Sequence, residues 1–266
     1  MLNSLKNAIG KLGVKLIKFT ARKAKIDLIR LAYWENGILK SHSLDASGES
    51  YFTQVYLRQC ISTDQPVFLD VGGNKGEYTQ LLRKAFPEAV IHTFEPNPAT
   101  YAALKQNLPN EPHLVNKGVG AENGTLELFY DPADTTSVQA TSDPEILKVI
   151  AKPENITSTN IDVTTLDAYC NTNNLTKIDL LKIDTEGFEL EALIGATELL
   201  KKNGIAMIQF EFNEVNIVKR RFIKDFYDLL EDFTFYRLDE KRLIPLGKWK
   251  PIHEVFMFQN IVAIKA

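Results

Sequence analysis

The sequence predicts an α/β fold built around one mostly parallel sheet with helices on both faces. From Val67 onward, short apolar runs of strand length alternate with longer segments of helical periodicity. The run 67–71 is continuous and apolar on both sides of its one acid, which is typical of a strand buried on both faces. Alternating strands and helices favour a parallel sheet whose ligands bind beyond the carboxyl ends of the strands.

The composition is that of an ordinary globular protein. The chain has 266 residues, 44% hydrophobic and 24% charged, enough for one large domain or two small ones. Its two cysteines, Cys60 and Cys170, cannot form a disulfide framework or a zinc site and suit a reducing compartment. No apolar run approaches the length of a membrane span, and lysines interrupt the start. We therefore expect no cleaved signal peptide and a cytoplasmic location.

Charge is distributed unevenly along the chain. The total is −3, but residues 1–30 hold eight Lys and Arg against Asp27 alone, so they carry +7 and the remainder carries −10. Apolar residues recur every three or four positions in 1–25, which predicts an amphipathic basic helix. Three alternatives stay open for it: packing on its own domain, pairing with a second copy, or peripheral contact with an anionic membrane. The acidic remainder argues against nucleic acid as a partner.

The elements after residue 66 can be placed in order. The predicted strands are 67–71, 89–95, 113–120, 126–130, 178–184, 205–212 and one near the C-terminus, and residues 159–170 are predicted to form a further strand and a short helix. A helix follows the first strand and stops at Pro87, and another begins at Asn97 as N-cap with Pro98 in the first position. Residues 131–158 are rich in Ser, Thr, Asp and Pro and are interpreted as a substrate lid or a surface loop.

A strand, a carboxylate and a glycine-rich turn follow one another in "FLDVGGNKGEY", residues 68–78. Gly72, Gly73 and Gly76 let the backbone turn sharply and let a ligand approach closely. The spacing departs from the G-x-G-x-x-G pattern of dinucleotide folds, because Asn74 stands where the second glycine would be. No Walker pattern follows either.

Two acids at strand ends suggest what this loop binds. Asp70 precedes the loop, where a carboxylate would repel a pyrophosphate but attract an ammonium group. Glu95 ends the next strand, from which an acid accepts hydrogen bonds from both hydroxyls of a ribose. An amino-acid head, a ribose and no phosphate describe S-adenosylmethionine, which we expect as the cofactor. The alternative for Asp70 is a carboxylate that only stabilises the loop.

A second group of acids begins in "LLKIDTEGFELEALIGA". Asp184 ends a predicted strand, and Glu186 opens the next helix, where the helix dipole favours acids. Either Glu186 is only a helix-start acid, or Asp184 and Glu186 lie beside the transferred methyl group as catalytic residues. Glu211 ends a later strand and is a candidate for the substrate pocket, with a solvated acid as the alternative. Two carboxylates do not define a metal site, so we expect no metal.

Taken together, "FLDVGGNKGEYT", "TFEPNP", "IDLLKIDTEGFELEALIGA" and the closing "NIVAI" resemble the FkbM family of S-adenosylmethionine-dependent methyltransferases. The resemblance covers roughly residues 50–265. It implies a class I methyltransferase fold, a Rossmann-like three-layer sandwich. Its sheet would have seven strands, mostly parallel, with the last strand antiparallel. It also implies O-methylation of a small molecule or a sugar.

The same resemblance assigns a role to each candidate residue. The implied cofactor-binding residues are Asp70, Gly72, Gly73, Asn74, Gly76, Glu95, Pro96, Asn97 and Val119. The loop residues would hold the methionine part, Glu95 the ribose, and Val119 would lie near the adenine. Asp184 and Glu186 would face the reacting centre.

These observations predict an extension, residues 1–45, and a methyltransferase domain, residues 46–266, that acts on a small molecule or glycan. Two alternatives remain. One is an NAD-linked or nucleotide-sugar oxidoreductase on a similar sheet. The other is a non-catalytic scaffold that is recruited by its N-terminal helix.

Overall fold

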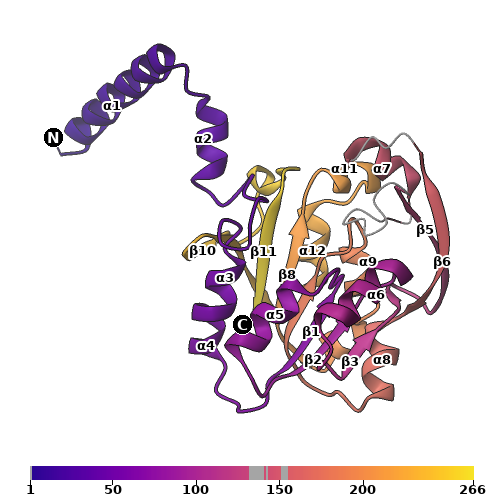
Figure 1. Cartoon of the computed structure of the whole chain (residues 1–266). Coiled ribbons are helices and arrows are strands. Elements are labelled where there is room, and N and C mark those ends of the chain that lie inside the picture. The colour runs from indigo at the N-terminus through magenta and orange to yellow at the C-terminus, as the bar shows by residue number, and fades with distance from the viewer. Residues whose placement is uncertain (1, 132–140, 142, 151–154) are drawn as a thin grey trace.

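A central sheet between two layers of helices forms the body of the protein (Figure 1). The computed structural model describes residues 2–131, 141, 143–150 and 155–266. Within these residues the main sheet has eight strands, in the spatial order β10 (Arg242–Pro245), β9 (Phe233–Asp239), β11 (Gln259–Lys265), β8 (Ile205–Phe212), β7 (Ile178–Ile183), β1 (Val67–Val71), β2 (Val90–Phe94) and β3 (His113–Val115). The five strands from β8 to β3 are mutually parallel, and β11 is antiparallel to both β8 and β9.

The predicted mostly parallel sheet and its antiparallel last strand are confirmed, but the predicted number of strands is wrong. The described residues contain an eighth strand, β10, which forms a hairpin with β9 around residues 240–241. The register of this hairpin begins at the pair Asp239 and Arg242. Their side chains also form an ion pair, with Nε of Arg242 3.0 Å from Oδ2 of Asp239. The turn and this local pairing extend the sheet by one edge strand.

The prediction of a single strand over 113–120 is also wrong. The chain leaves the main sheet after Val115, and Gly118 and Val119 form β4 (Gly118–Val119) in a second sheet. Asn116 explains the break, because its side-chain amide donates to the carbonyl oxygens of Glu95 and Pro96 at 2.8 and 3.0 Å. These hydrogen bonds hold the exit from β3 against the end of β2.

The second sheet has the order β4, β6 (Thr157–Thr164) and β5 (Gly124–Tyr130). Strands β5 and β6 are antiparallel and stand at the side of the main sheet, with α7 (Pro144–Ile150) beside them (Figure 1). Strand β4 is parallel to β6. The small sheet thus stands beside the ends of the main strands that carry the candidate residues.

Helices fill the intervals between strands largely as the sequence indicates. Beyond α7 and the N-terminal helices, they are α3 (Glu49–Tyr51), the π-helical turn η1 (Phe52–Tyr56), α4 (Leu57–Cys60), α5 (Glu77–Ala85), α6 (Pro98–Asn107), α8 (Leu166–Thr172), α9 (Glu189–Ile194), α10 (Thr197–Lys201), α11 (Val215–Lys219), α12 (Ile223–Leu229) and the 3₁₀ turn η2 (Pro251–His253). The predicted cap is confirmed, since Oδ1 of Asn97 accepts from the N–H of Ala99 at 2.9 Å at the start of α6.

Two apolar layers hold the sandwich together. Side chains that alternate along β1 point to opposite faces, so Leu69 joins the layer under α8, α9, α10 and α12, whereas Phe68 joins the layer under α5 and residues 49–60. Both side chains are fully buried. Phe210 of β8 stacks on Phe226 of α12 with ring centroids 4.3 Å apart. This packing on both faces fixes the strand ends that carry the site.

The N-terminal residues form two helices that project from the body, α1 (Leu2–Ala24) and α2 (Leu28–Trp34) (Figure 1). The predicted helix over 1–25 is confirmed by α1. The chain then joins the body, where Ile38 pairs with Gln259 and Nζ of the buried Lys40 lies 2.7 Å from Oδ1 of Asp239. The division at residue 45 stays a prediction. No helix of the described residues is long and apolar enough to cross a membrane.

Candidate active site

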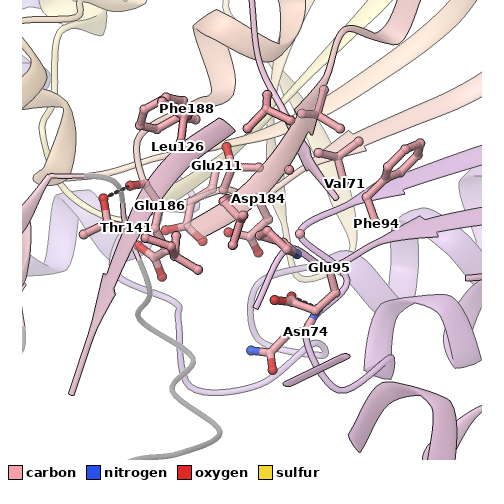
Figure 2. A pocket seen from close by; sticks show the side chains of 18 of the residues that line it. Val71, Asn74, Phe94, Glu95, Leu126, Thr141, Asp184, Glu186, Phe188 and Glu211 are labelled. Carbon is pink, nitrogen blue, oxygen red and sulfur yellow. Dashed lines mark hydrogen bonds between the residues drawn. The ribbon is translucent and has the colours of Figure 1, made fainter. Parts of the chain in front are cut away.

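One cavity of about 430 Å³ opens at the carboxyl ends of β1, β2, β7 and β8 (Figure 2). The second sheet closes it from the side with apolar side chains. Its lining includes Ser41, Val71, Gly72, Asn74, Phe94, Glu95, Pro96, Val119, Leu126, Leu128, Thr141, Ile161, Val163, Asp184, Glu186, Phe188, Glu211, Asn213 and Glu214. Volume and apolar lining are typical of a small-molecule or cofactor site.

The glycine loop after β1 forms part of the cavity wall through Gly72 and Asn74. Gly72 has a φ of +84°, and a Cβ added there would lie 1.7 Å from the carbonyl oxygen of Asp184. A Cβ on Gly73 would lie 2.1 Å from Cγ2 of Thr93. The N–H groups of Gly72 and Gly73 both donate to the carbonyl oxygen of Phe94. The loop is therefore held tightly between the ends of β2 and β7, with no room for larger residues.

Asp70 lies behind this loop and does not line the cavity. Its side chain is fully buried, and its Oδ2 accepts from Oγ1 of Thr79 at 2.6 Å. Its Oδ1 has no hydrogen-bond partner in the part of the chain that the structure describes. Burial raises the pKa of Asp70, and Lys182 opposes that shift. Direct contact of Asp70 with a ligand stays a prediction.

Glu95 lies at the end of β2 with its carboxylate facing the loop. Its Oε2 accepts from the N–H of Asn74 at 3.0 Å (Figure 2). Its Oε1 accepts from the N–H of Asn97 at 2.8 Å. Burial raises its pKa to about 7, although both hydrogen bonds act to lower it. The two N–H groups fix the direction of the carboxylate, and each oxygen keeps a lone pair for a ligand hydroxyl.

The neighbours of Glu95 divide between the cavity and the core. Pro96 lines the cavity, whereas Asn97 serves as the buried N-cap of α6 and Gly76 precedes α5 away from the opening. Val119 lines the cavity from the second sheet and is 5% exposed. Of the candidate cofactor residues, the structure thus brings five to the cavity and leaves Asp70, Gly73, Gly76 and Asn97 behind it.

Three acids gather on the opposite side of the cavity. Figure 2 shows Asp184, Glu186 and Glu211 close together at the ends of β7 and β8. Burial raises the pKa of Glu186 to about 8, with further contributions from the charges of Asp184 and Glu189. Burial also raises the pKa of Glu211 well above its usual range, assisted by Asp184 and Glu186. The carboxyls of Glu186 and Glu211 therefore hold protons far more readily than exposed acids do.

Local backbone geometry directs Glu186 into the cavity. Glu186 and Gly187 both have positive φ, +53° and +102°. The buried Glu189 holds this turn, because its Oε1 accepts from the N–H groups of Thr185 and Gly187 at 2.9 and 3.1 Å. Thr141 adds a hydrogen bond from its hydroxyl to the carbonyl oxygen of Glu186. The turn is thus tied from two sides.

Lys182 of β7 was not among the candidates, yet it connects the acids to the core. Its ammonium lies 2.9 Å from Oδ2 of Asp184 and 3.9 Å from Oε1 of Glu49, and the residue is 2% exposed. Burial alone would lower the pKa of Lys182, but Asp184, Glu49 and Asp70 outweigh it and raise the pKa. Its position in "KID", two residues before the strand-end acid, places both side chains on one face of the strand.

Glu49 in turn belongs to a buried hydrogen-bond chain. Its Oε2 accepts from the hydroxyl of Ser47 at 2.7 Å, and its Oε1 accepts from the amide of Gln209 at 3.0 Å. Tyr78 donates to the same Gln209 at 2.6 Å. This chain links the segment before β1 with β7, β8 and α5. Its members are far apart in the sequence, so local patterns gave no signal for it.

Other lining residues also escaped the sequence analysis. Asn213 donates its side-chain amide to Glu211, and Glu214 follows it at the cavity edge. Phe188 lines the acidic side beside Lys219, whose ammonium lies 4.3 Å from the ring centroid. The apolar wall could have been found, because Leu126 with Leu128 and Ile161 with Val163 alternate with polar residues as strand side chains do.

Half of the predicted lid over 131–158 falls outside the described residues. Within the described part, Thr141 pairs with Phe129 of β5 and lines the cavity, and α7 follows it. A role in closing the cavity stays a prediction. Among the residues that the structure describes, no group of three or more His, Cys, Asp and Glu side chains could hold a metal ion.

The strand arrangement defines the class of fold. Apart from β10, the sheet order is β3-β2-β1-β7-β8-β11-β9, with β11 antiparallel and the cavity at the carboxyl ends of the parallel strands. This is a class I methyltransferase fold, as predicted. The model of the methyltransferase FkbM domain matches residues 70–237, which is more than half of the chain. The chain belongs to the FkbM methyltransferase family.

Curated proteins that are similar in sequence to this chain are also named methyltransferases. Methyltransferase 1 of Beauveria bassiana is 27% identical over 165 residues, covering 53% of this chain and 64% of its own length. The 2-O-methyltransferase NoeI of Sinorhizobium fredii is 24% identical over 162 residues, covering 56% of this chain and 65% of its own length. The matched part thus spans less than two thirds of each relative.

A solved structure of a methyltransferase FkbM from Methylobacillus flagellatus KT is also similar. It has 15% sequence identity and a TM-score of 0.45, covering 80% of this chain and 47% of that one. The family assignment depends on the match of the sequence to the FkbM domain. The fold class depends on the order and direction of the strands in this chain.

The buried cation gives a first prediction. Replacing Lys182 by Met should lower the free energy of unfolding by about 3–5 kcal/mol, because Glu49 and Asp184 lose the ammonium between them. Equilibrium urea denaturation measures this. The control Lys201→Met removes an exposed ion pair and should change the stability far less. Equal midpoints for the two variants would contradict the role of Lys182.

The raised pKa of Glu95 gives a second prediction. Its pKa is about 7 in the folded protein against a usual 4.5, so the folded state holds the proton more tightly. The contribution of Glu95 to the free energy of unfolding therefore falls as the pH rises from its usual pKa to its pKa in the folded protein. Glu95→Gln should remove that part of the decline, measured by urea denaturation at about pH 5 and about pH 8. The exposed Glu122→Gln should keep the wild-type dependence of stability on pH. If Glu95→Gln also kept that dependence, the raised pKa would not belong to Glu95.

Proposed function

We propose that this protein is an S-adenosylmethionine-dependent methyltransferase that methylates a hydroxyl group of a small molecule or sugar. The proposal is supported mainly by two different groups of residues that line the two sides of one cavity. Gly72, Asn74 and Glu95 lie on one side, and Asp184, Glu186 and Glu211 lie on the other. Membership of the FkbM methyltransferase family supports it.

The residues on the loop side fit the methyl donor. Asn74 lines the cavity and carries a buried side-chain oxygen without a hydrogen-bond partner in the described structure, which suits the ammonium of an amino-acid head. Asp70 carries a second such oxygen behind the loop, where its negative charge would favour the same ammonium from a greater distance. The missing Cβ of Gly72 keeps the loop close to the end of β7. The carboxylate of Glu95 suits a ribose diol. These features together match a ligand with a cationic head, a sugar and no phosphate.

The apolar wall suits the remaining part of that ligand. Val119, Leu128, Ile161 and Val163 line the cavity and are almost fully buried. Such a surface can pack on a flat purine ring and exclude water from it. When bound, the donor would supply an electrophilic methyl group, so the hard chemistry would belong to the cofactor.

The acidic side would receive the acceptor. Glu186 has a pKa of about 8, close to neutral pH, which suits a group that takes a proton from a hydroxyl. The buried Lys182 holds Asp184 from behind, so Asp184 would orient the acceptor or the donor head. Glu211, held by Asn213, would form the wall beyond it. The chain would then contribute alignment, exclusion of water and one proton acceptor.

The family match favours this proposal over the oxidoreductase alternative, because it covers both the glycine loop and the acidic segment. NoeI is named a 2-O-methyltransferase, which supports a hydroxyl as the acceptor.

Incubating the protein with methyl-labelled S-adenosylmethionine and fractionated cell metabolites would identify the acceptor. Binding of NAD without binding of S-adenosylhomocysteine in calorimetry would contradict the proposal.

Two substitutions should separate binding from turnover. Glu95→Ala should weaken binding of S-adenosylhomocysteine by about 10- to 100-fold, because the ribose loses a charged acceptor. Glu186→Gln should leave that affinity nearly unchanged and lower methyl transfer by about 10²- to 10⁴-fold. Calorimetry measures the first effect and transfer of labelled methyl the second.

The exposed Glu122→Gln is the control and should resemble the wild type in both assays. Full turnover in Glu186→Gln would show that alignment suffices without a base at that position. Wild-type affinity in Glu95→Ala would place the ribose elsewhere.

A further inference from the structure

The N-terminal arm, defined as α1, α2 and the residues between them, exposes an apolar surface. Leu12 is 70% exposed, Leu16 62%, Phe19 57% and Ile29 68%. The body does not cover these side chains, so packing on its own domain, one of the three alternatives, is excluded for the described part of α1. Soluble proteins rarely expose a contiguous apolar patch of this kind unless it binds something.

The arm sorts apolar and cationic residues onto different faces of α1. Leu12, Leu16 and Phe19 recur at helical spacing on one face, Ile17 lies at the side of that face, and Val14 lies opposite it. The cations follow their own stripe, with exposed Lys15, Lys18 and Arg22 among them. An apolar face bordered by cations matches a helix that lies in the plane of a membrane surface.

Charge distinguishes a membrane from a second copy as the occupant. No acidic residue occurs before Asp27, so two paired copies of α1 would bring lysines together with no acid to neutralise them. An anionic bilayer surface would attract the same residues, each contributing roughly 1 kcal/mol. The arm carries most of the +7 of residues 1–30, which separates it electrostatically from the acidic body.

Two glycines lower the intrinsic stability of α1, as expected for a helix that becomes stable only on binding. A Cβ at Gly10 or at Gly13 would meet nothing within 4 Å, so no packing in the protein requires glycine there. Each glycine weakens an isolated helix by about 1 kcal/mol relative to alanine. Burial of the apolar face in a lipid surface would compensate for that loss.

The base of the arm is fixed to the body beside the cavity. Arg242 donates to the carbonyl oxygen of Glu35 at 3.0 Å, and Lys40 pairs with Asp239 and lies 5.0 Å from the ring centroid of Trp34. Ser41, the next residue, lines the cavity. A surface bound by the arm would therefore be coupled to the body next to the cavity.

We propose that the N-terminal arm attaches this protein peripherally to anionic phospholipid surfaces. The test is co-sedimentation of the full chain with vesicles of phosphatidylcholine alone or mixed with phosphatidylglycerol. The wild type should bind the mixed vesicles, bind the neutral ones weakly, and dissociate in high salt. The double variant Lys15→Glu/Lys18→Glu should lose at least about tenfold in binding, as should Leu16→Glu/Phe19→Glu.

Matched controls carry the same changes on the body. Lys241→Glu/Lys248→Glu reverses two exposed charges, and Ile252→Glu replaces a side chain that is 79% exposed. Both should bind vesicles like the wild type. Light scattering without lipid should give a monomer. Failure to bind the mixed vesicles, or binding unchanged in either arm variant, would overturn the proposal. So would a stable dimer that Leu16→Glu/Phe19→Glu dissociates, which would assign the surface to a second copy.

Discussion

The close approach of two backbone segments is the constraint on which the site depends. Strands β1 and β7 pair in parallel, with Val71 opposite Ile183, so the glycine loop and the acidic turn leave the sheet side by side. Gly72 touches the carbonyl of Asp184 so closely that no side chain fits between them. The wall formed by the glycine loop and the acidic wall therefore share a single cavity, although about 110 residues of sequence separate them.

Charge inside the sandwich is arranged around this junction. The charge of Lys182 interacts with five acids, namely Glu49, Asp70, Asp184, Glu186 and Glu211. The ammonium of Lys182 opposes the rise in pKa that burial causes at Glu49 and Asp70. At the cavity, burial and the charges of neighbouring acids raise the pKa values of Glu186 and Glu211. A site that keeps buried carboxyls of raised pKa beside a buried ammonium can hold a cationic ligand, and one of these carboxyls can accept a proton from a second ligand.

Local patterns predicted the parts of the site that lie within single β-to-helix connections. Gly72, Glu95, Asp184 and Glu186 each stand at a strand end, and the parallel sheet brings strand ends together without further information. What the sequence could not show depends on contacts between distant segments. Asn116 diverts the chain from β3 into the second sheet by binding backbone carbonyls at the end of β2. Lys182 looked like one more strand residue because its partner Glu49 lies 133 positions earlier, and the hairpin strand β10 carried too weak an apolar pattern.

The measurement that tests the junction most directly is calorimetric binding of S-adenosylhomocysteine to Gly72→Ala, compared with Gly124→Ala. A Cβ at Gly72 must displace the Asp184 carbonyl, whereas a Cβ at Gly124 meets nothing within 4 Å. We expect Gly124→Ala to bind like the wild type and Gly72→Ala to bind at least about tenfold more weakly, since even a shift of roughly 1 Å disturbs a preorganised site. If a folded Gly72→Ala protein bound S-adenosylhomocysteine with unchanged affinity, the site would not depend on the contact between Gly72 and the carbonyl of Asp184.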